Sequence, residues 1–290
     1  MSVAIVTDST ASLPSDLVAS HGIRVVPLHV ILDDQQHSEG IDITTSEVAA
    51  ALRKFTVVST SRPSPQAFLD AYEAAAAAGA DAVVSIHLSS EMSGTVASAA
   101  LAASQSQIPV EVVDSRSVGM AMGYAALSAA EAAQRGEDAK TVAAIASSRA
   151  RAATIIFYVD TLEHLRRGGR IGAASALLGS ALAIKPLLAL SDGHINPIEK
   201  VRTAARALSR LEELALQGVD ASGESGVDIA VHHLDSPARA GDLADRLRTR
   251  VPPSATVILV ELGAVLGAHV GPGTIAVAVS PRPSPTRGRG

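Results

Sequence analysis

The sequence predicts an α/β protein built from two α/β domains. Short apolar runs and longer helical patterns alternate through the first half of the chain, which is the arrangement of βαβ units around a parallel sheet. In the second half, two apolar runs flank a turn at residues 191–194, which predicts a hairpin and a mixed sheet. The chain has 290 residues, more than one hydrophobic core usually serves. We expect an N-terminal domain of residues 1–153, a C-terminal domain of residues 154–280 and a disordered tail of residues 281–290.

Apolar runs bounded by polar clusters place the strands of the first half, and cap residues place the helices between them. Thr44 and Glu47 have the spacing of a capping box, and Ser64 followed by Pro65 suits a helix start. The expected strands are residues 3–6, 25–32, 57–59, 81–87 and 110–113. The expected helices are residues 14–21, 45–54, 66–78, 96–105, 118–134 and 139–152, with a polar turn at 33–40.

The second half follows the same rules with more turns. Gly168 and Gly169 stop a short helix, and residues 263–273 are rich enough in glycine to predict a loop. The expected strands are residues 155–159, 185–190, 195–201, 227–232, 256–261 and 274–279. The expected helices are residues 161–167, 172–183, 203–217 and 237–250.

Composition excludes several classes of function. The net charge of −5 and the aromatic content of 2% disfavour nucleic-acid binding, which needs basic surfaces and stacking rings. The absence of cysteine excludes disulfides and thiolate metal sites. No dinucleotide fingerprint, P-loop or HExxH motif is present, and the adjacent His232 and His233 would point to opposite faces of a strand. We therefore expect neither a metal nor a cofactor.

The location of the protein follows from the lack of targeting signals. Residues 1–5 carry no basic region of a signal peptide. The longest nearly uncharged apolar run, residues 171–184, is too short to cross a bilayer core of ~30 Å as a helix. We expect a cytoplasmic protein without a transmembrane segment, for which a transient membrane contact stays open.

Residues 88–95 are the stretch around which the rest is organised. They join an apolar strand to an alanine-rich helix and contain three serines, a threonine and a glycine. The free N–H groups and the dipole of a helix start favour an anion. Polar clusters also follow the other expected strands, at residues 7–10, 59–64 and 114–117, where ligands of parallel sheets collect. The sequence therefore predicts an anion site at this edge of the sheet.

Taken together, the loop motifs resemble one family. They are Val-Thr-Asp-Ser-Thr at residues 6–10, Thr-Ser-Arg-Pro-Ser at 60–64, Ser-Ser-Glu-Met-Ser-Gly-Thr at 89–95, Val-Asp-Ser at 113–115, the run 160–171, Ile-Lys-Pro at 184–186, Asp-Gly at 192–193, Glu-Lys-Val-Arg-Thr at 199–203 and Gly-Ala-His-Val-Gly-Pro-Gly at 267–273. This ordered set resembles the DegV family of bacterial fatty-acid-binding proteins. The resemblance implies one long-chain fatty acid held between the two domains. It also implies a partner, the catalytic subunit of a fatty acid kinase, which makes the acyl phosphate used in phospholipid synthesis, so that this chain binds and does not catalyse.

The resemblance also assigns roles by position. Thr60 and Ser93 become hydroxyl ligands of the carboxylate, with His269 close to the same group. Arg170 falls near the mouth of the site, and Arg202 in a segment suited to docking the kinase. The secondary positions around the site are Ser61, Ser90, Gly94 and Thr95.

Two departures from the family pattern affect the polar residues around this set. Arg62 stands where the family usually has glutamine, and Ala268 and Val270 stand where it has threonine on each side of the histidine.

Physical chemistry supports a fatty acid on two counts. Each buried methylene contributes about 0.8 kcal/mol, and hydroxyls, helix-start N–H groups and an imidazole or guanidinium are fair partners for a buried carboxylate. The expected tunnel wall is aliphatic and consists of Leu88, Met92, Leu162, Leu165, Ile171, Leu177, Leu178, Leu182, Ile184 and Leu187.

Simpler interpretations of the same residues remain open at this point. Ser93 and Thr95 could be plain helix caps, Thr60 a turn residue, and His269 an exposed loop histidine. Arg170 could satisfy the last carbonyls of a helix, and Arg202 could be a solvated charge.

Two other functions fit the same residues. The chain could be an enzyme acting on a small anionic substrate, with Ser93 as nucleophile or anion clamp and His269 as base. It could also be a regulatory sensor that binds an acyl ligand and a partner protein.

Overall fold

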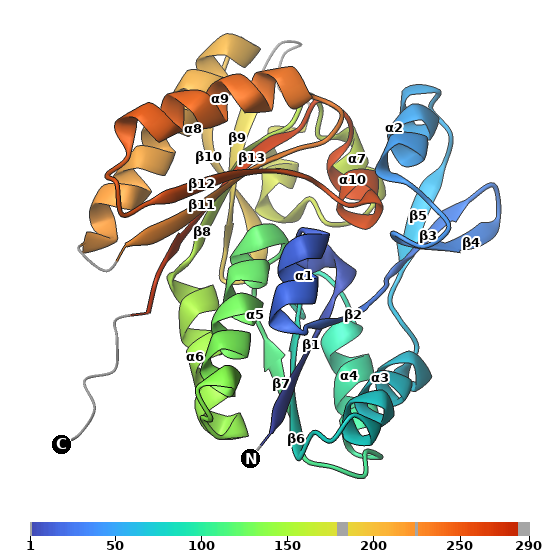
Figure 1. The fold of residues 1–290 in the computed structure, drawn as a ribbon. Coiled ribbons are helices and arrows are strands. Elements are labelled where there is room, and N and C mark those ends of the chain that lie inside the picture. The colour runs from blue at the N-terminus through green and yellow to red at the C-terminus, as the bar shows by residue number, and fades with distance from the viewer. Residues whose placement is uncertain (1, 179–184, 224–225, 284–290) are drawn as a thin grey trace.

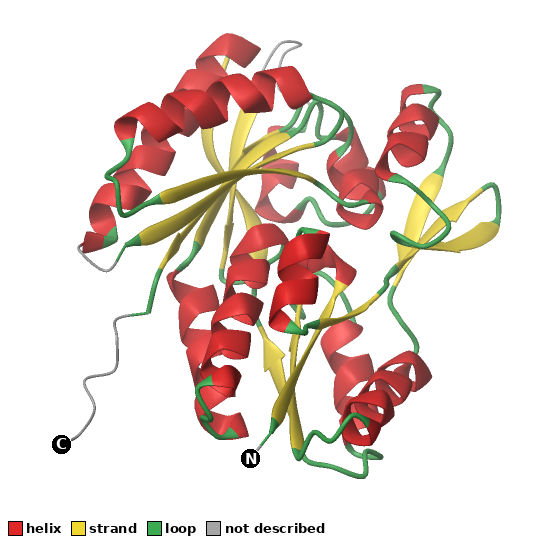
Figure 2. Ribbon diagram, in the orientation of Figure 1, coloured by secondary structure: helices red, strands yellow, loops and turns green. Residues whose placement is uncertain are grey.

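The computed structural model describes residues 2–178, 185–223 and 226–283, which form three sheets flanked by helices (Figures 1 and 2). The first sheet is entirely parallel. Its strand order is β2 (Arg24–Val26), β1 (Val3–Asp8), β6 (Ala82–His87) and β7 (Val110–Asp114). Strand β6 lies inside the sheet and all six of its residues are buried, as its unbroken apolar run predicts.

The second sheet is mixed, as the hairpin pattern predicts. Its order is β10 (His194–Val201), β9 (Lys185–Ser191), β8 (Thr154–Tyr158), β13 (Ile275–Pro281), β11 (Val227–His233) and β12 (Thr256–Glu261). Only β11 and β12 pair in parallel, and the other neighbours are antiparallel. The predicted fold class, a parallel sheet plus a separate mixed sheet, is confirmed.

Helices cover both faces of both sheets. Helices α3 (Pro65–Ala77) and α4 (Thr95–Ala103) cover one face of the parallel sheet. Helices α5 (Gly119–Gln134) and α6 (Ala139–Ala152) lie between the two sheets and contact both of them, with α1 (Ser15–His21) beside α5 (Figure 1). Helices α8 (Ala204–Ala221) and α9 (Pro237–Arg250) cover the outer face of the mixed sheet. One apolar core therefore continues from the parallel sheet through α5 and α6 to the inner face of the mixed sheet.

A third, small sheet stands to one side of the molecule (Figure 2). It is antiparallel, with β4 (Gln35–Ser38), β3 (His29–Leu32) and β5 (Val58–Ser61), and α2 (Thr45–Arg53) begins at the predicted capping box. Three predictions are wrong here. The strand expected at 25–32 breaks at Pro27, which has no N–H to donate. The turn expected at 33–40 contains β4, and β5 pairs with β3 outside the parallel sheet.

The segments that follow β8 and β12 also depart from the prediction. The glycine-rich run 263–273 contains a helix, α10 (Ala264–Val270), because Gly263 takes its N-cap position and Gly271 ends it with a φ of 79°. After α7 (Glu163–Arg167), the helix expected at 172–183 is a 3₁₀ turn, Gly172–Leu177, and its remainder lies largely outside the described residues. The expected tail also lies mostly outside them, since the description ends at residue 283.

Candidate ligand-binding site

One cavity is lined by residues that belong to the three sheets or directly follow their strands. Its walls come from the loop after β6, from β5, from the inner face of the mixed sheet and from α10. The space between the lining atoms is about 960 Å³, including the part that opens to solvent.

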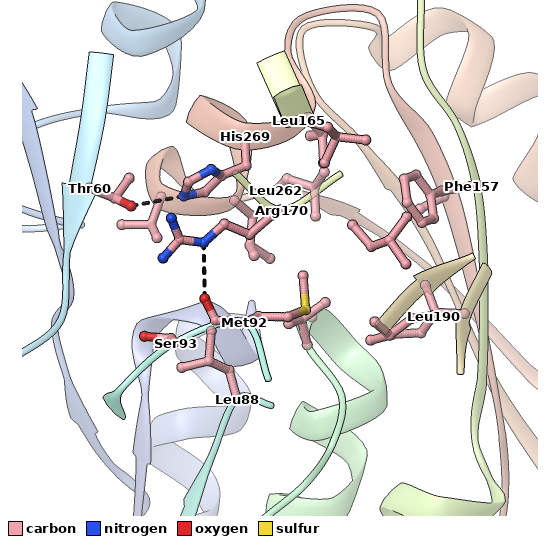
Figure 3. A pocket seen from close by; sticks show the side chains of 18 of the residues that line it. Thr60, Leu88, Met92, Ser93, Phe157, Leu165, Arg170, Leu190, Leu262 and His269 are labelled. Carbon is pink, nitrogen blue, oxygen red and sulfur yellow. Dashed lines mark hydrogen bonds between the residues drawn. The ribbon is translucent and has the colours of Figure 1, made fainter. Parts of the chain in front are cut away.

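The cavity is polar at one end and apolar along the rest (Figure 3). Thr60, His269, Arg170 and Ser93 gather at the polar end, while Phe157 and Leu190 lie at the far end. Apolar side chains form most of the remaining wall, which also contains His232 and Thr274. They are Leu28, Leu88, Met92, Val118, Ile155, Leu165, Ile195, Leu262, Val265, Leu266, Val270 and Ala276. Among the described residues, no aspartate or glutamate lines the cavity, whereas two arginines do.

Thr60 and His269 make the central contact of the polar end. Thr60 Oγ1 and His269 Nε2 are 2.8 Å apart, although Thr60 belongs to β5 and His269 to the last turn of α10. The other ring nitrogen, Nδ1, is buried without a hydrogen-bond partner among the described residues and packs against Gly168, where a β-carbon would collide with it. The glycine of the predicted helix stop therefore also makes room for the imidazole.

The imidazole of His269 is neutral at physiological pH. Burial first, and then the positive charge of Arg170, lowers the pKa of His269 to about 4. A neutral ring has one N–H and one bare nitrogen, so it can donate to the hydroxyl of Thr60 or accept from it.

Ser93 is placed by the loop between β6 and α4. This loop begins at Leu88, whose N–H donates to Asp8 Oδ2 at 3.1 Å, and Asp8 also accepts from His87 Nδ1 at 3.0 Å. Asp8 and His87 are both fully buried. The carboxylate at the end of β1 thus fixes the start of the loop, and the hydroxyl of Ser93, 2.9 Å from Thr95 Oγ1, lines the cavity.

Arg170 joins the two sides of the polar end. Its Nε donates to the carbonyl of Met92 at 3.0 Å and its Nη1 to the carbonyl of Gly168 at 2.6 Å. Arg170 therefore ties the Ser93 loop to the chain segment that contacts His269. The exposed side chain of Arg62 crosses Gly94 at the same end, where a β-carbon would collide with it.

The secondary residues predicted from the sequence divide into two groups. Ser61 lines the cavity, and its Oγ is buried with no hydrogen-bond partner in the part of the chain that the structure describes. Ser90, Gly94 and Thr95 do not line it. Ser90 Oγ donates to Asp114 at 2.5 Å, which ties down the loop, and Gly94 is the N-cap of α4.

Arg202 lies apart from the cavity, exposed in the turn between β10 and α8. It forms no ion pair within the described part of the chain.

The predicted tunnel wall is correct in part. Leu88, Met92 and Leu165 line the cavity. Leu187 does not, because it faces α8 on the outer side of the mixed sheet, whereas Leu190 of the same strand faces inward. The cavity is also not lined by Leu162, Ile171, Leu177 or Leu178, and Leu182 and Ile184 lie outside the described residues.

Other lining residues were not predicted. Phe157 and Ile155 on β8 and Ala276 on β13 form part of the apolar wall, and His232 on β11 accepts from the N–H of Met120 at 3.1 Å. Their alternation along the strands shows that they share a face. The sequence does not say which face the ligand meets.

Residues 2–178, 185–223 and 226–283 contain neither a candidate metal site nor a candidate membrane span. No three histidine or acidic side chains there are grouped so that they could hold a metal ion. No helix in the same ranges is long and apolar enough to cross a membrane.

Comparison with known proteins places this geometry in context. A family model described as an uncharacterised protein of the DegV family matches residues 2–282. A DegV domain-containing protein of Streptomyces coelicolor is 54% identical over 280 residues, covering 97% of this chain and 99% of that protein.

Solved structures agree with the sequence relatives. A DegV family protein from Thermus thermophilus, described by its fatty acid binding, matches with a TM-score of 0.90 and 33% identity over 97% of this chain and 100% of that one. DegV from Bacillus subtilis, described as a fatty acid binding protein, matches with a TM-score of 0.87 and 32% identity over 97% and 99% of the two chains.

Proposed function

The chain belongs to the DegV family, and on that premise we propose that it binds one long-chain fatty acid in the cavity, carboxylate at the polar end. The observation that carries the proposal is the one-sided polarity of the cavity. Hydroxyls, an imidazole and two guanidinium groups meet at one end, and the rest of the wall is hydrocarbon apart from His232 and Thr274. A fatty acid has the same distribution of charge along its length. The fatty acids bound by the related proteins support this assignment.

The carboxylate is held by neutral donors backed by positive charge. In this proposal the ring proton of His269 is assigned to Nε2: in that tautomer the imidazole donates to Thr60 Oγ1, and the hydroxyl hydrogen of Thr60 is left for the carboxylate. Ser93 and Ser61 present further hydroxyls, and that of Ser61 has no other partner. Arg170 and Arg62 supply the charge that a desolvated carboxylate needs.

The acyl chain is held by burial alone. At about 0.8 kcal/mol per methylene, a long chain gains on the order of 10 kcal/mol, of which immobilising the ligand removes about 4 kcal/mol or more. The roles of Thr60, Ser93, His269 and Arg170, like the domain boundary between residues 153 and 154, are parts of this proposal.

We further propose that the bound carboxylate is presented to the catalytic subunit of a fatty acid kinase, which forms the acyl phosphate for phospholipid synthesis in the cytoplasm. The polar end supports this, since the exposed Arg62 places it next to solvent. Arg202, exposed and without an ion pair in the described part of the chain, is the candidate docking residue.

The geometry does not favour the alternative of an enzyme with Ser93 as nucleophile. The hydroxyl of Ser93 contacts Thr95, and the imidazole of His269 contacts Thr60. A nucleophile and its base need to contact each other, and the base needs an orienting partner, which the unpartnered Nδ1 of His269 lacks. The role proposed here is therefore that of a non-catalytic binding protein.

Lipid analysis tests the binding proposal directly. Organic extraction and mass spectrometry of the purified protein should find one long-chain fatty acid per chain, and delipidated protein should bind added oleate. A protein that is empty and also fails to bind oleate would contradict the proposal.

A reconstitution tests the kinase step. With a fatty acid kinase subunit, ATP and the loaded protein, acyl phosphate should form, and none should form without the kinase. Arg202→Ala should lower the rate, whereas the control Arg135→Ala, an exposed arginine at the end of α5, should not. Equal rates for the two variants would remove Arg202 from the docking surface.

A further inference from the structure

Helix α10, which carries His269, lacks a cap of its own. It spans only seven residues, Ala264–Val270, and its N-cap residue is Gly263, which has no side chain to bond the first N–H groups. Helices this short are marginal unless other parts of the protein hold them. The placement of α10 matters because Val265, Leu266, His269 and Val270 all line the cavity.

Glu39 supplies the missing cap from the other end of the sequence. The N–H of Val265 donates to Glu39 Oε1 at 2.7 Å, across 226 residues of sequence. Glu39 is only 8% exposed. Its carboxylate lies so close to Gly263 that a β-carbon there would collide with Oε1. A buried carboxylate at a helix start satisfies an N–H and complements the helix dipole.

Glu39 is itself held between the cavity wall and the parallel sheet. Its backbone N–H donates to the carbonyl of Leu28 at 2.9 Å, and the N–H of Leu28 donates to Ser9 Oγ at 2.9 Å. Leu28 lines the cavity. Burial raises the pKa of the Glu39 carboxyl, while the hydroxyl of Ser9 and the N–H of Val265 favour its charged form.

We infer that Glu39 is a positioning residue for the head-group site: by capping α10 it sets the position from which His269 reaches Thr60. The inference rests on the proposed function, since it assumes that the Thr60–His269 end holds the ligand carboxylate. Glu39 does not line the cavity, so its effect on binding passes through α10.

The structure offers a matched control for this inference. Thr45 Oγ1 donates to the carbonyl of Leu262 at 3.1 Å, a second bond that joins the α2 side of the molecule to the segment before α10. It bonds no N–H of the helix start. Thr45→Val therefore removes one hydrogen bond between the same two parts of the molecule and leaves the bond between Glu39 and Val265 intact.

The experiment compares Glu39→Ala, Glu39→Gln and Thr45→Val with the wild type. Oleate affinity is measured by displacement of a fluorescent fatty acid, and the ring resonances of His269 by ¹⁵N NMR. We expect Glu39→Ala to bind oleate about tenfold more weakly and to shift the His269 resonances. Glu39→Gln, whose amide oxygen can still accept from Val265, should bind oleate within about threefold of the wild-type affinity and should leave the His269 resonances at their wild-type positions. Thr45→Val should change neither the affinity nor the resonances.

The inference is overturned if folded Glu39→Ala binds as tightly as wild type with unshifted His269 resonances, or if Thr45→Val weakens binding equally. Should Glu39→Ala not fold, Gly263→Ala displaces the same carboxylate from a different residue and must reproduce the loss of affinity. Failure of the proposed function gives a different result, because the wild-type protein would then bind no oleate.

Discussion

Thr60 and His269 are 209 residues apart in the sequence and meet with 2.8 Å between the hydroxyl oxygen and Nε2. The contact joins the small antiparallel sheet to α10. It brings together the two residues on which the proposed carboxylate site depends most.

Removing the hydroxyl of Thr60 should weaken ligand binding without unfolding the protein. Thr60→Val keeps the shape of the side chain but removes a hydrogen bond to a charged group, which contributes about 1.5–3 kcal/mol, so oleate affinity should fall by about tenfold or more. Thr60→Ser should recover most of the affinity. Ser90→Ala is the control, because Ser90 bonds Asp114 outside the cavity. Displacement titrations check the order, and equal affinities for all three variants would contradict it.

Filling the apolar end should select against long chains. Ala276 pairs with Phe157 on β8 and with His232 on β11, and all three residues line the cavity. Ala276→Leu adds three carbons to this wall and displaces about as many methylenes of the ligand, a loss of about 2 kcal/mol. We expect 18-carbon acids to lose about thirtyfold in affinity and 12-carbon acids much less. A uniform loss across chain lengths would mean that the tail does not reach Ala276.

Acid should destabilise the protein through His232. Burial first, and then the neighbouring His233, lowers the pKa of His232 from 6.5 to about 4. Between these values the unfolded chain binds more protons than the folded one, so the free energy of unfolding falls as pH falls from 6.5 to 4, by up to about 3 kcal/mol from this residue. Urea unfolding at pH 7 and pH 5 should show a smaller loss for His232→Gln than for wild type. An equal loss of unfolding free energy in wild type and in His232→Gln would show that His232 does not cause the loss of stability in acid.

The ion pair between α6 and the mixed sheet should be costly to break. Arg149 is 5% exposed and bonds Asp228, Ser128 and Ser280. Burial alone would raise the pKa of Asp228, but hydrogen bonds from Arg282 and Thr256 and the charge of Arg149 hold it below 3.8. Asp228→Asn leaves the buried guanidinium of Arg149 without its counter-charge and should cost about 3–5 kcal/mol in urea unfolding.

An exposed pair provides the contrast for that measurement. Glu163 bonds Arg166 and Arg167 on the surface of α7, where water screens the charges, so Glu163→Gln should leave the free energy of unfolding almost unchanged. Similar losses of unfolding free energy for Asp228→Asn and Glu163→Gln would mean that burial does not determine how much the Arg149–Asp228 pair stabilises the protein.

The sequence predicts regular elements well where local signals agree with burial. The capping box at Thr44 and Glu47, the proline after Ser64 and the apolar run 82–87 all lie where α2, α3 and β6 begin or run. These signals are local, because a cap or an apolar run is decided by residues within one or two turns.

Features set by distant residues could not be predicted in the same way. The glycines at 263, 267 and 271 predict a loop, yet the segment forms α10, in which the N–H of Val265 bonds Glu39 from more than 200 residues away. Likewise, β5 reads as another strand of the parallel sheet, and nothing near it in sequence reveals that it pairs with β3 instead. Thr60, Ser93 and His269 were found through motif resemblance, whereas Phe157 and Ala276 carry no motif.

Helix α5 limits how a ligand can enter. Thirteen of its 16 residues are buried, most of them alanine, glycine or methionine, and it touches a sheet on each side. Pulling the two sheets apart would expose apolar surface along both sides of this helix and break the Arg149 cluster, so the sheets and the helix between them behave as one rigid block. For the ligand proposed here, this leaves local displacement of the loops and short helices at the rim as the route of entry and exit, while the block stays closed.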